Sequence, residues 1–133
     1  MPHFIRIATN RKNMHLVEKM IDGVCAQLKF DENMYGKVYV AVTEAVYNGM
    51  LHGNKLDAQK HIDVSYVIKP NYRVLEFTIT DDGDGFSPSQ VPDPTTEENI
   101  LKESGRGIFL IKNMATRYSY NGKGNSIIME FDY

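Results

Sequence analysis

The order of helical and strand-like periodicities along the chain constrains the fold more than any other feature of the sequence. A short alternating run at 4–7 precedes two segments, 10–29 and 31–52, in which apolar residues recur at helical spacing. Asn10 and Asp31 stand at the starts of these segments, where their side chains can cap a helix. We therefore expect an opening strand followed by two long helices.

Strand-like runs dominate the middle of the chain. Residues 61–68 and 73–80 are β-rich and are separated by Lys69-Pro70-Asn71-Tyr72, which has turn composition, so they predict an antiparallel hairpin. Beyond the hairpin, 87–104 contains three prolines and little periodicity. A segment of this length without periodicity is typical of a surface loop, and we interpret it as a lid over a binding site.

The last part of the chain repeats the alternation of helix and strand. Apolar spacing predicts a third helix over 107–117, and two short β-rich runs, 117–120 and 126–131, predict a closing strand pair. No repeat or second domain is apparent, and 42% hydrophobic residues suffice for one core. We expect a single α+β domain over 1–133, a two-layer α/β sandwich with helices on one face of a mixed, mostly antiparallel sheet.

Composition limits the functions open to the chain. Basic and acidic residues number 15 and 17, give a net charge of -2, and are mixed along the sequence. No basic block predicts contact with nucleic acid or an anionic membrane, so we expect a protein or small-molecule partner. No stretch approaches the roughly 20 apolar residues of a membrane span, and residues 1–10 lack a secretion signal, which predicts a cytoplasmic location. The single cysteine, Cys25, is expected to be a buried core thiol.

Three polar residues share one face of the second predicted helix. Glu44, Asn48 and His52 are four residues apart, so an acid, an amide and an imidazole form one stripe. Taken alone, such a stripe is also what an ordinary solvated helix face looks like.

A glycine-rich turn follows the second strand of the predicted hairpin. In Asp81-x-Gly83-x-Gly85 the glycines let the backbone approach a ligand closely. An aspartate at the end of a strand can accept a hydrogen bond from an exocyclic amine such as that of adenine. Taken alone, the pattern also fits a simple β-turn.

A second glycine pattern, Gly105-Arg106-Gly107, opens the third predicted helix. Free backbone N–H groups and the helix dipole can receive phosphate oxygens there, with Arg106 as a charged partner. Alone, it also fits a plain junction between a loop and a helix. Together, the three patterns fit one nucleotide, with Asn48 as a metal ligand and Glu44 as a base.

These patterns resemble the boxes of a known family. Residues 44–54 look like the N box, and 81–86 and 105–111 look like the two glycine boxes, of the GHKL or Bergerat-fold ATPases. Within that superfamily the chain is most similar to the small anti-sigma-factor serine kinases of bacterial partner-switching systems. The resemblance implies a Bergerat ATP-binding fold that uses ATP and Mg²⁺, and it spans essentially the whole chain.

The resemblance also implies roles for individual residues. Asn48 would bind the Mg²⁺ that bridges the phosphates, Asp81 would recognise adenine, and Glu44 would be the general base toward a target serine or a water. Gly124-Asn125-Ser126 matches the family's Gly-Thr box loosely and makes Ser126 a pocket residue. Gly83 and Gly85 would shape the adenine pocket, and Gly105, Arg106 and Gly107 would hold the phosphates. His52, Gly53 and Asn54 would line the far end of the N box, and His52 is also expected to contact ATP.

The activity implied is that of a serine/threonine-protein kinase. Such a kinase phosphorylates an anti-anti-sigma (STAS-domain) antagonist and sequesters a sigma factor or another regulatory protein, and a homodimer is compatible with this role. Two alternatives remain open at the level of sequence. One is a non-catalytic, ATP-dependent partner-switching module, and the other is a stand-alone histidine-kinase-type catalytic domain that acts in trans.

Overall fold

The computed structural model describes residues 3–83 and 103–133, and the side chains of all of these except 103–108. Its strands and helices follow the predicted order. The strands are β1 (His3–Ala8), β2 (His61–Lys69), β3 (Val74–Asp81), β4 (Arg117–Tyr120) and β5 (Ser126–Asp132). The helices are α1 (Met14–Gln27), α2 (Glu32–Asn48) and α4 (Glu103–Met114), with short helical turns η1 (Arg11–Asn13), η2 (Gly49–Gly53) and η3 (Pro70–Tyr72).

The strands form one sheet in the order β1-β2-β3-β5-β4. Every neighbouring pair is antiparallel, so the described part of the sheet is antiparallel throughout rather than mixed. In this register Asp81 at the end of β3 lies opposite Ile62 of β2, and Thr80 lies opposite Ser126 of β5. The predicted α+β arrangement of helices and sheet is confirmed.

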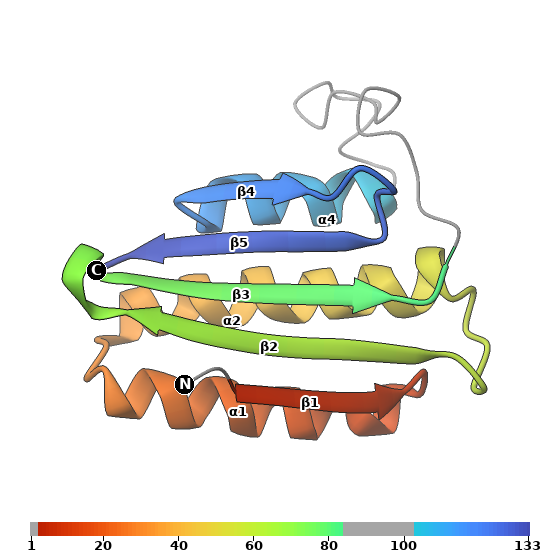
Figure 1. The fold of residues 1–133 in the computed structure, drawn as a ribbon, viewed down its shortest axis with the longest axis horizontal. Helices are drawn as coiled ribbons and strands as arrows, with labels where there is room; N and C mark the ends of the chain where they lie inside the picture. Colours follow the sequence, from red (N-terminus) through yellow and green to blue (C-terminus); the bar gives the residue numbers. More distant parts are fainter. Residues whose placement is uncertain (1–2, 84–102) are drawn as a thin grey trace.

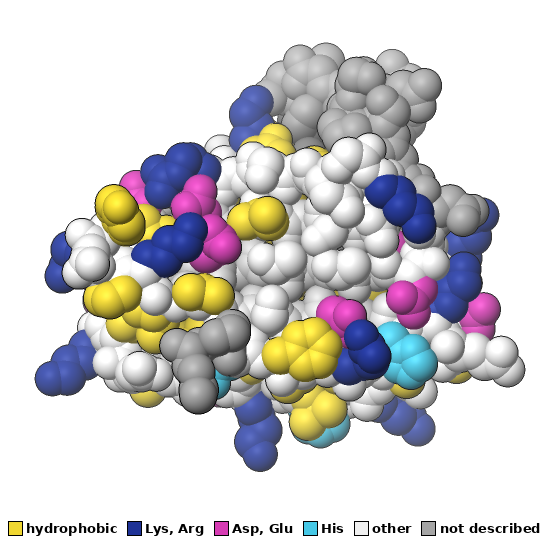
Figure 2. All heavy atoms as spheres, viewed as in Figure 1, with side chains coloured by type: hydrophobic (Ala, Val, Ile, Leu, Met, Phe, Trp, Pro, Cys, Tyr) yellow, Lys and Arg dark blue, Asp and Glu magenta, His cyan; other side chains and the backbone are white. Residues whose placement is uncertain are grey.

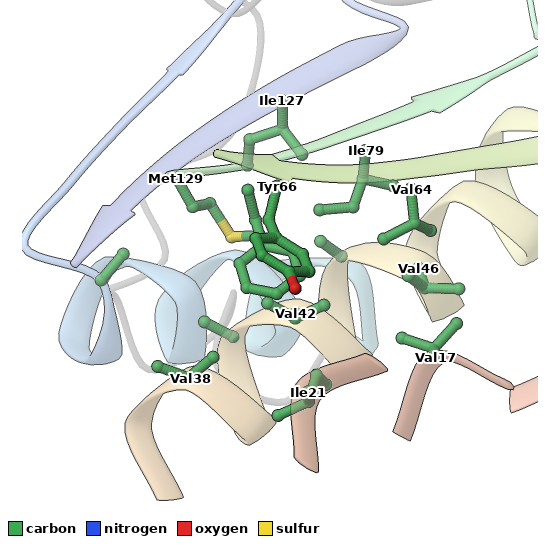
Figure 3. Packing of buried hydrophobic residues seen from close by; sticks show 14 of the residues in the cluster. Val17, Ile21, Val38, Val42, Val46, Val64, Tyr66, Ile79, Ile127 and Met129 are labelled. Atoms are coloured by element: carbon green, nitrogen blue, oxygen red, sulfur yellow. The ribbon is translucent and has the colours of Figure 1, made fainter. Parts of the chain in front are cut away.

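The helices pack on one face of this sheet (Figure 1). Each helix buries one apolar stripe and each strand buries every second residue, and these side chains point into a shared core. A fully buried aliphatic side chain in such a core contributes about 1.5–3 kcal/mol relative to exposure. Figure 3 shows this packing between the helix residues Val17, Ile21, Val38, Val42 and Val46 and the strand residues Val64, Tyr66, Ile79, Ile127 and Met129.

The other face of the sheet is not covered by a helix of the described chain (Figure 1). Figure 2 views this face and shows mainly uncharged side chains and backbone, with charged side chains around the margin. Ion pairs such as Lys69 with Glu76, 2.7 Å apart, lie on it and add little stability because they are exposed to water. The described residues contain no helix long and apolar enough to cross a membrane.

Local side-chain chemistry sets the helix starts. The Asp31 carboxylate accepts the N–H of Met34 at 2.8 Å, which confirms the predicted N-cap of α2. Asn10 accepts the N–H of Lys12 and so starts η1, the turn that leads into α1. The first helix ends at Gln27, before the predicted Lys29, because Lys29 adopts a left-handed backbone with φ of 56°.

Two other helix boundaries differ from the prediction. Helix α4 begins at Glu103, four residues before the predicted start at Gly107, because a glycine costs a helix only about 1 kcal/mol and does not by itself mark its beginning. Regular α-helix ends at Asn48 in α2, and the chain continues to Gly53 as the wider π-helical turn η2. Both differences change how backbone groups are presented at the predicted site.

Candidate functional site

The predicted site residues gather at one end of the molecule. Figure 1 shows the end of β3, the end of α2 with η2, and the start of α4 at this end. Asp81 is the last residue of β3. Because side chains alternate along a strand and Ile79 points into the core, the Asp81 carboxylate also points toward the helices. It therefore meets η2 instead of solvent on the open face.

The π-helical turn η2 gives α2 its unusual end. The N–H of Asn54 donates to the carbonyl of Gly49 at 2.8 Å, a separation of five residues instead of four. The wider turn directs the backbone of Gly49 and Gly53 at β3. Single π turns of this kind occur frequently at functional sites.

Three glycines surround the Asp81 carboxylate. A Cβ atom placed on Gly53 would lie 2.3 Å from the carboxyl carbon of Asp81, and one on Gly49 would lie 3.6 Å from the Asp81 Cβ. On Gly83 it would lie 2.2 Å from the Gly53 carbonyl oxygen and 2.8 Å from Asp81 Oδ1. A side chain at Gly83 would collide with backbone, and one at Gly53 would require the Asp81 carboxylate or η2 to shift. We call Gly49, Gly53 and Gly83 the glycine cradle.

The cradle changes the acidity of Asp81. Burial raises the pKa of its carboxyl above the ordinary value, although the N–H of Gly83, which donates to Oδ1 at 2.7 Å, works in the opposite direction. The nearby Asp82 raises the pKa further, and Lys123 and Lys60 lower it through their charges. The result is a half-buried acceptor, partly stripped of water, at the end of a strand.

Asn125 holds Asp81 from the side of the sheet, a role that sequence reasoning missed. The N–H of Asp81 donates to the Asn125 carbonyl at 2.9 Å, and the Asn125 side-chain amide donates to the Asp81 carbonyl, also at 2.9 Å. The Asn121 Oδ1 in turn accepts the N–H groups of Gly124, Asn125 and Ser126, which shapes the turn between β4 and β5. The predicted closing strand pair required a connection here but did not reveal its contact with Asp81.

Ser126 does not join this group. Its hydroxyl and that of Thr80 share a hydrogen bond of 2.7 Å. Because Thr80 precedes Asp81 in the strand, its side chain points to the opposite face of the sheet. The structure therefore places the Ser126 hydroxyl apart from the Asp81 carboxylate.

Glu44 and Asn48 lie one turn apart near the end of α2, as their spacing predicted. Both are half-buried, and neither side chain forms a hydrogen bond or ion pair with another residue of the described chain. His52 lies within η2 and is exposed. The wider turn interrupts the four-residue spacing, so His52 does not continue the Glu44–Asn48 stripe at the regular helical angle.

The second glycine pattern lies inside α4. Gly105, Arg106 and Gly107 belong to the first two turns of a helix that begins at Glu103. The first four N–H groups of a helix lack intrahelical partners, so in α4 the free donors begin at Glu103 instead of at Gly107. Gly85 and residues 87–102 of the predicted lid lie outside the described residues.

A hollow of about 290 Å³ lies at the opposite end of the helix layer, between the end of α1 and the start of α2. Tyr35 lines it and donates its hydroxyl to Asp22 at 2.6 Å. Cys25, also in its lining, is only 4% exposed, and burial raises the pKa of its thiol to about 11. The thiol is thus a core residue as predicted, and this hollow is separate from the glycine cradle.

Comparison with known proteins agrees with the architecture. Residues 7–131 match the model of the histidine kinase-like ATPase domain, so the chain belongs to that family. This confirms the resemblance to the GHKL ATPases. Among individual proteins, the chain is similar to the serine-protein kinase RsbW of Oceanobacillus iheyensis, with 26% identity over 119 residues, covering 85% of this chain and 74% of that protein.

Proposed function

We propose that this protein binds Mg-ATP beside the glycine cradle and transfers the γ-phosphoryl group to a serine or threonine of a protein substrate. The observation that carries the proposal is the Asp81 carboxylate, which lies against Gly53 and accepts the N–H of Gly83, while Asn125 holds the Asp81 main chain. Family membership and the similarity to a serine-protein kinase support the same activity.

Asp81 has the chemistry needed to recognise adenine. Its carboxylate can accept a hydrogen bond from the exocyclic amine, a donor that guanine replaces with a carbonyl oxygen. Gly53 and Gly83 let the backbone of η2 and of the turn after β3 pack directly around this carboxylate. A partly desolvated acceptor discriminates strongly, because a guanine bound in the pose of adenine would direct its O6, an acceptor, at the carboxylate and leave it unpaired.

The phosphates would extend from this point toward Asn48 and the start of α4. Helix N–H groups and the dipole favour anions at the start of α4, and Gly105, Arg106 and Gly107 lie in that part of the helix. The Asn48 amide oxygen would hold Mg²⁺ together with phosphate oxygens, because this ion prefers oxygen ligands. Bound Mg²⁺ would neutralise charge on the phosphates.

Glu44 would act on the attacking hydroxyl. It lies one helical turn before Asn48, half-buried and without a described partner. As general base it would accept the proton of the substrate serine as the oxygen attacks the γ-phosphorus, while ADP leaves. The helix N–H groups stabilise the charge on the equatorial oxygens.

The protein substrate we propose is a STAS-domain antagonist of a sigma factor. In its unphosphorylated form the antagonist would displace the sigma factor or other regulator that this protein otherwise sequesters. The similar protein of Oceanobacillus iheyensis is named a serine-protein kinase, which is consistent with a serine as the target. We also propose that the protein acts in the cytoplasm and forms a homodimer.

Calorimetric titration with ATP and Mg²⁺ tests the nucleotide site. We expect Asp81→Asn to weaken binding roughly tenfold to a hundredfold, the effect of losing a hydrogen bond to a charged group. Asp82→Asn is the matched control, because it removes the charge of the exposed neighbouring carboxylate. Its amide oxygen can still accept the N–H of His61, which donates to Asp82 Oδ2 at 2.7 Å in the wild type. No binding at millimolar ATP, or equal binding by Asp81→Asn and the wild type, would refute the site.

Phosphotransfer is tested with ATP labelled at the γ-phosphate and each STAS-domain protein of the source organism. An acid-stable label on a serine that depends on Glu44 supports the kinase. Binding of ATP without transfer to any of them would favour the non-catalytic module, and an acid-labile label would favour the histidine-kinase-type domain.

A further inference from the structure

Asn54, which follows η2 directly, is completely buried. Its main chain is fully paired: the N–H donates to the Gly49 carbonyl at 2.8 Å, and the carbonyl accepts the N–H of Asp57 at 3.0 Å. A buried polar side chain next to the cradle must also find partners, because an unpaired amide would cost stability.

The side chain of Asn54 finds three partners on three different segments. Its Nδ2 donates to the Thr9 hydroxyl at 2.8 Å and to the His61 carbonyl at 3.0 Å. Its Oδ1 accepts the N–H of Asp82 at 2.8 Å. One amide therefore connects the end of β1, the start of β2 and the turn that follows β3.

Only a carboxamide of this length meets all three requirements. The uncharged amide donates twice and accepts once, whereas an ionised aspartate cannot donate and would direct charge at the His61 carbonyl. Alanine would leave the N–H of Asp82 and the carbonyl of His61 without this partner.

The bond to Asp82 bears directly on the cradle. Asp82 joins Asp81 to Gly83, and Gly83 lies against the carbonyl of Gly53, the residue before Asn54. Asn54 thus connects the π turn to the middle of the segment that carries the adenine acceptor. If this connection is lost, the turn after β3 can move away from η2, and the carboxylate moves with it.

We propose that Asn54 is a positioning residue for base selectivity: by holding the N–H of Asp82 against η2, it keeps the Asp81 carboxylate in the cradle, where it favours adenine over guanine. This inference rests on the proposed nucleotide site. It differs from the role that the resemblance implied, in which Asn54 lines the far end of the N box, because a completely buried side chain acts through the backbone it holds.

The test compares Asn54→Ala and Asn54→Asp with Thr9→Val. Thr9→Val removes the Asn54 contact to β1, and the hydroxyl's own 2.8 Å bond to the Lys60 carbonyl, without touching the bond to Asp82. Thr9→Val therefore controls for a general loss of stability, because it removes buried hydrogen bonds but leaves the bond between Asn54 and Asp82 in place. Asn54→Asp keeps an oxygen for Asp82 and provides a second variant if Asn54→Ala does not fold. Circular dichroism melts record the stability of each.

Affinities for ATP and GTP give the main readout. We expect Asn54→Ala to reduce the preference for ATP over GTP about tenfold, Asn54→Asp to fall between it and the wild type, and Thr9→Val to stay within about twofold. A preference that survives in Asn54→Ala, or that falls equally in Thr9→Val at equal loss of melting temperature, would overturn the proposal.

Hydrogen exchange of the Asp82 amide gives a readout that needs no nucleotide. We expect it to accelerate at least about tenfold in Asn54→Ala and to change little in Thr9→Val. Unchanged exchange in Asn54→Ala would overturn the positioning role even if ATP binds. If the wild type binds no nucleotide, the proposed function fails together with base selectivity, and the exchange data still decide whether Asn54 holds the turn.

Discussion

Replacing Gly53 with alanine tests the contact on which the candidate site depends. The added Cβ would lie 2.3 Å from the Asp81 carboxyl carbon and 2.4 and 2.5 Å from its oxygens, whereas ordinary contacts begin at 3.4 Å. The carboxylate or η2 must therefore move by about 1 Å. Among the described glycines only Gly124 has a positive φ, so the cost at Gly53 is steric and does not arise from its dihedral angles.

The magnitude follows from two effects of this displacement. Inserting a methyl group into a tightly packed site costs about 1–3 kcal/mol of folding free energy. A misplacement of about 1 Å in a positioned group can reduce its contribution by up to about a hundredfold. We expect Gly53→Ala to melt at lower temperature and to bind ATP at least about tenfold more weakly.

Gly36→Ala is the matched control for this prediction. Gly36 lies inside α2, and a Cβ there would meet nothing within 4 Å. Alanine should stabilise this helix by about 0.5–1 kcal/mol and leave ATP binding unchanged. Both variants are measured by thermal melting and by calorimetric titration with ATP. Wild-type ATP affinity in Gly53→Ala would refute the reasoning, because the cradle would then tolerate the side chain that the geometry excludes.

Three further predictions concern single side chains. Glu44→Gln should bind ATP normally and lose phosphotransfer by roughly 10²–10⁴-fold, measured as label on the protein substrate; unchanged transfer would remove Glu44 from the mechanism. Burial raises the pKa of Asp81, so the folded state loses stability as the pH rises through that pKa and the carboxyl ionises. Asp81→Asn carries no charge and should therefore have a higher melting temperature than the wild type at pH 7. The difference in melting temperature should disappear in acid, where the wild-type carboxyl is also neutral. A gap that persists at low pH would contradict this assignment. Asp31→Ala should cost about 1 kcal/mol in a denaturant titration through loss of the N-cap, with ATP affinity as the unchanged control.

The elements of this fold were predictable where local chemistry decides them. Asp31 caps α2 by accepting an N–H three residues away, and the turn around Pro70 connects two strands that are neighbours in sequence. The start of α4 was placed too late, since a polar first turn gives no periodic signal and Gly107 was interpreted as the beginning.

The candidate site was predictable as a set of residues but not as a geometry. The spacing of Glu44 and Asn48 placed both on one helix face, and the glycine pattern marked Asp81 at the end of a strand. The π turn gave no sequence signal, because its five-residue hydrogen bond depends on how Gly49 and Gly53 meet β3. The face on which Ser126 lies depends on the pairing of β5 with β3.

By itself, the sequence determined the succession of elements, the capped helix starts and the kinds of groups available for a nucleotide, because these depend on residues within a few positions of one another. Only the tertiary structure decided that Gly53 lies against Asp81, that Asn54 holds Asp82, and that Asn125 holds the Asp81 backbone. These contacts join residues 28 to 44 positions apart. They form only when the helix layer packs on the sheet in one register, and the free energy that fixes that register comes from the whole buried core.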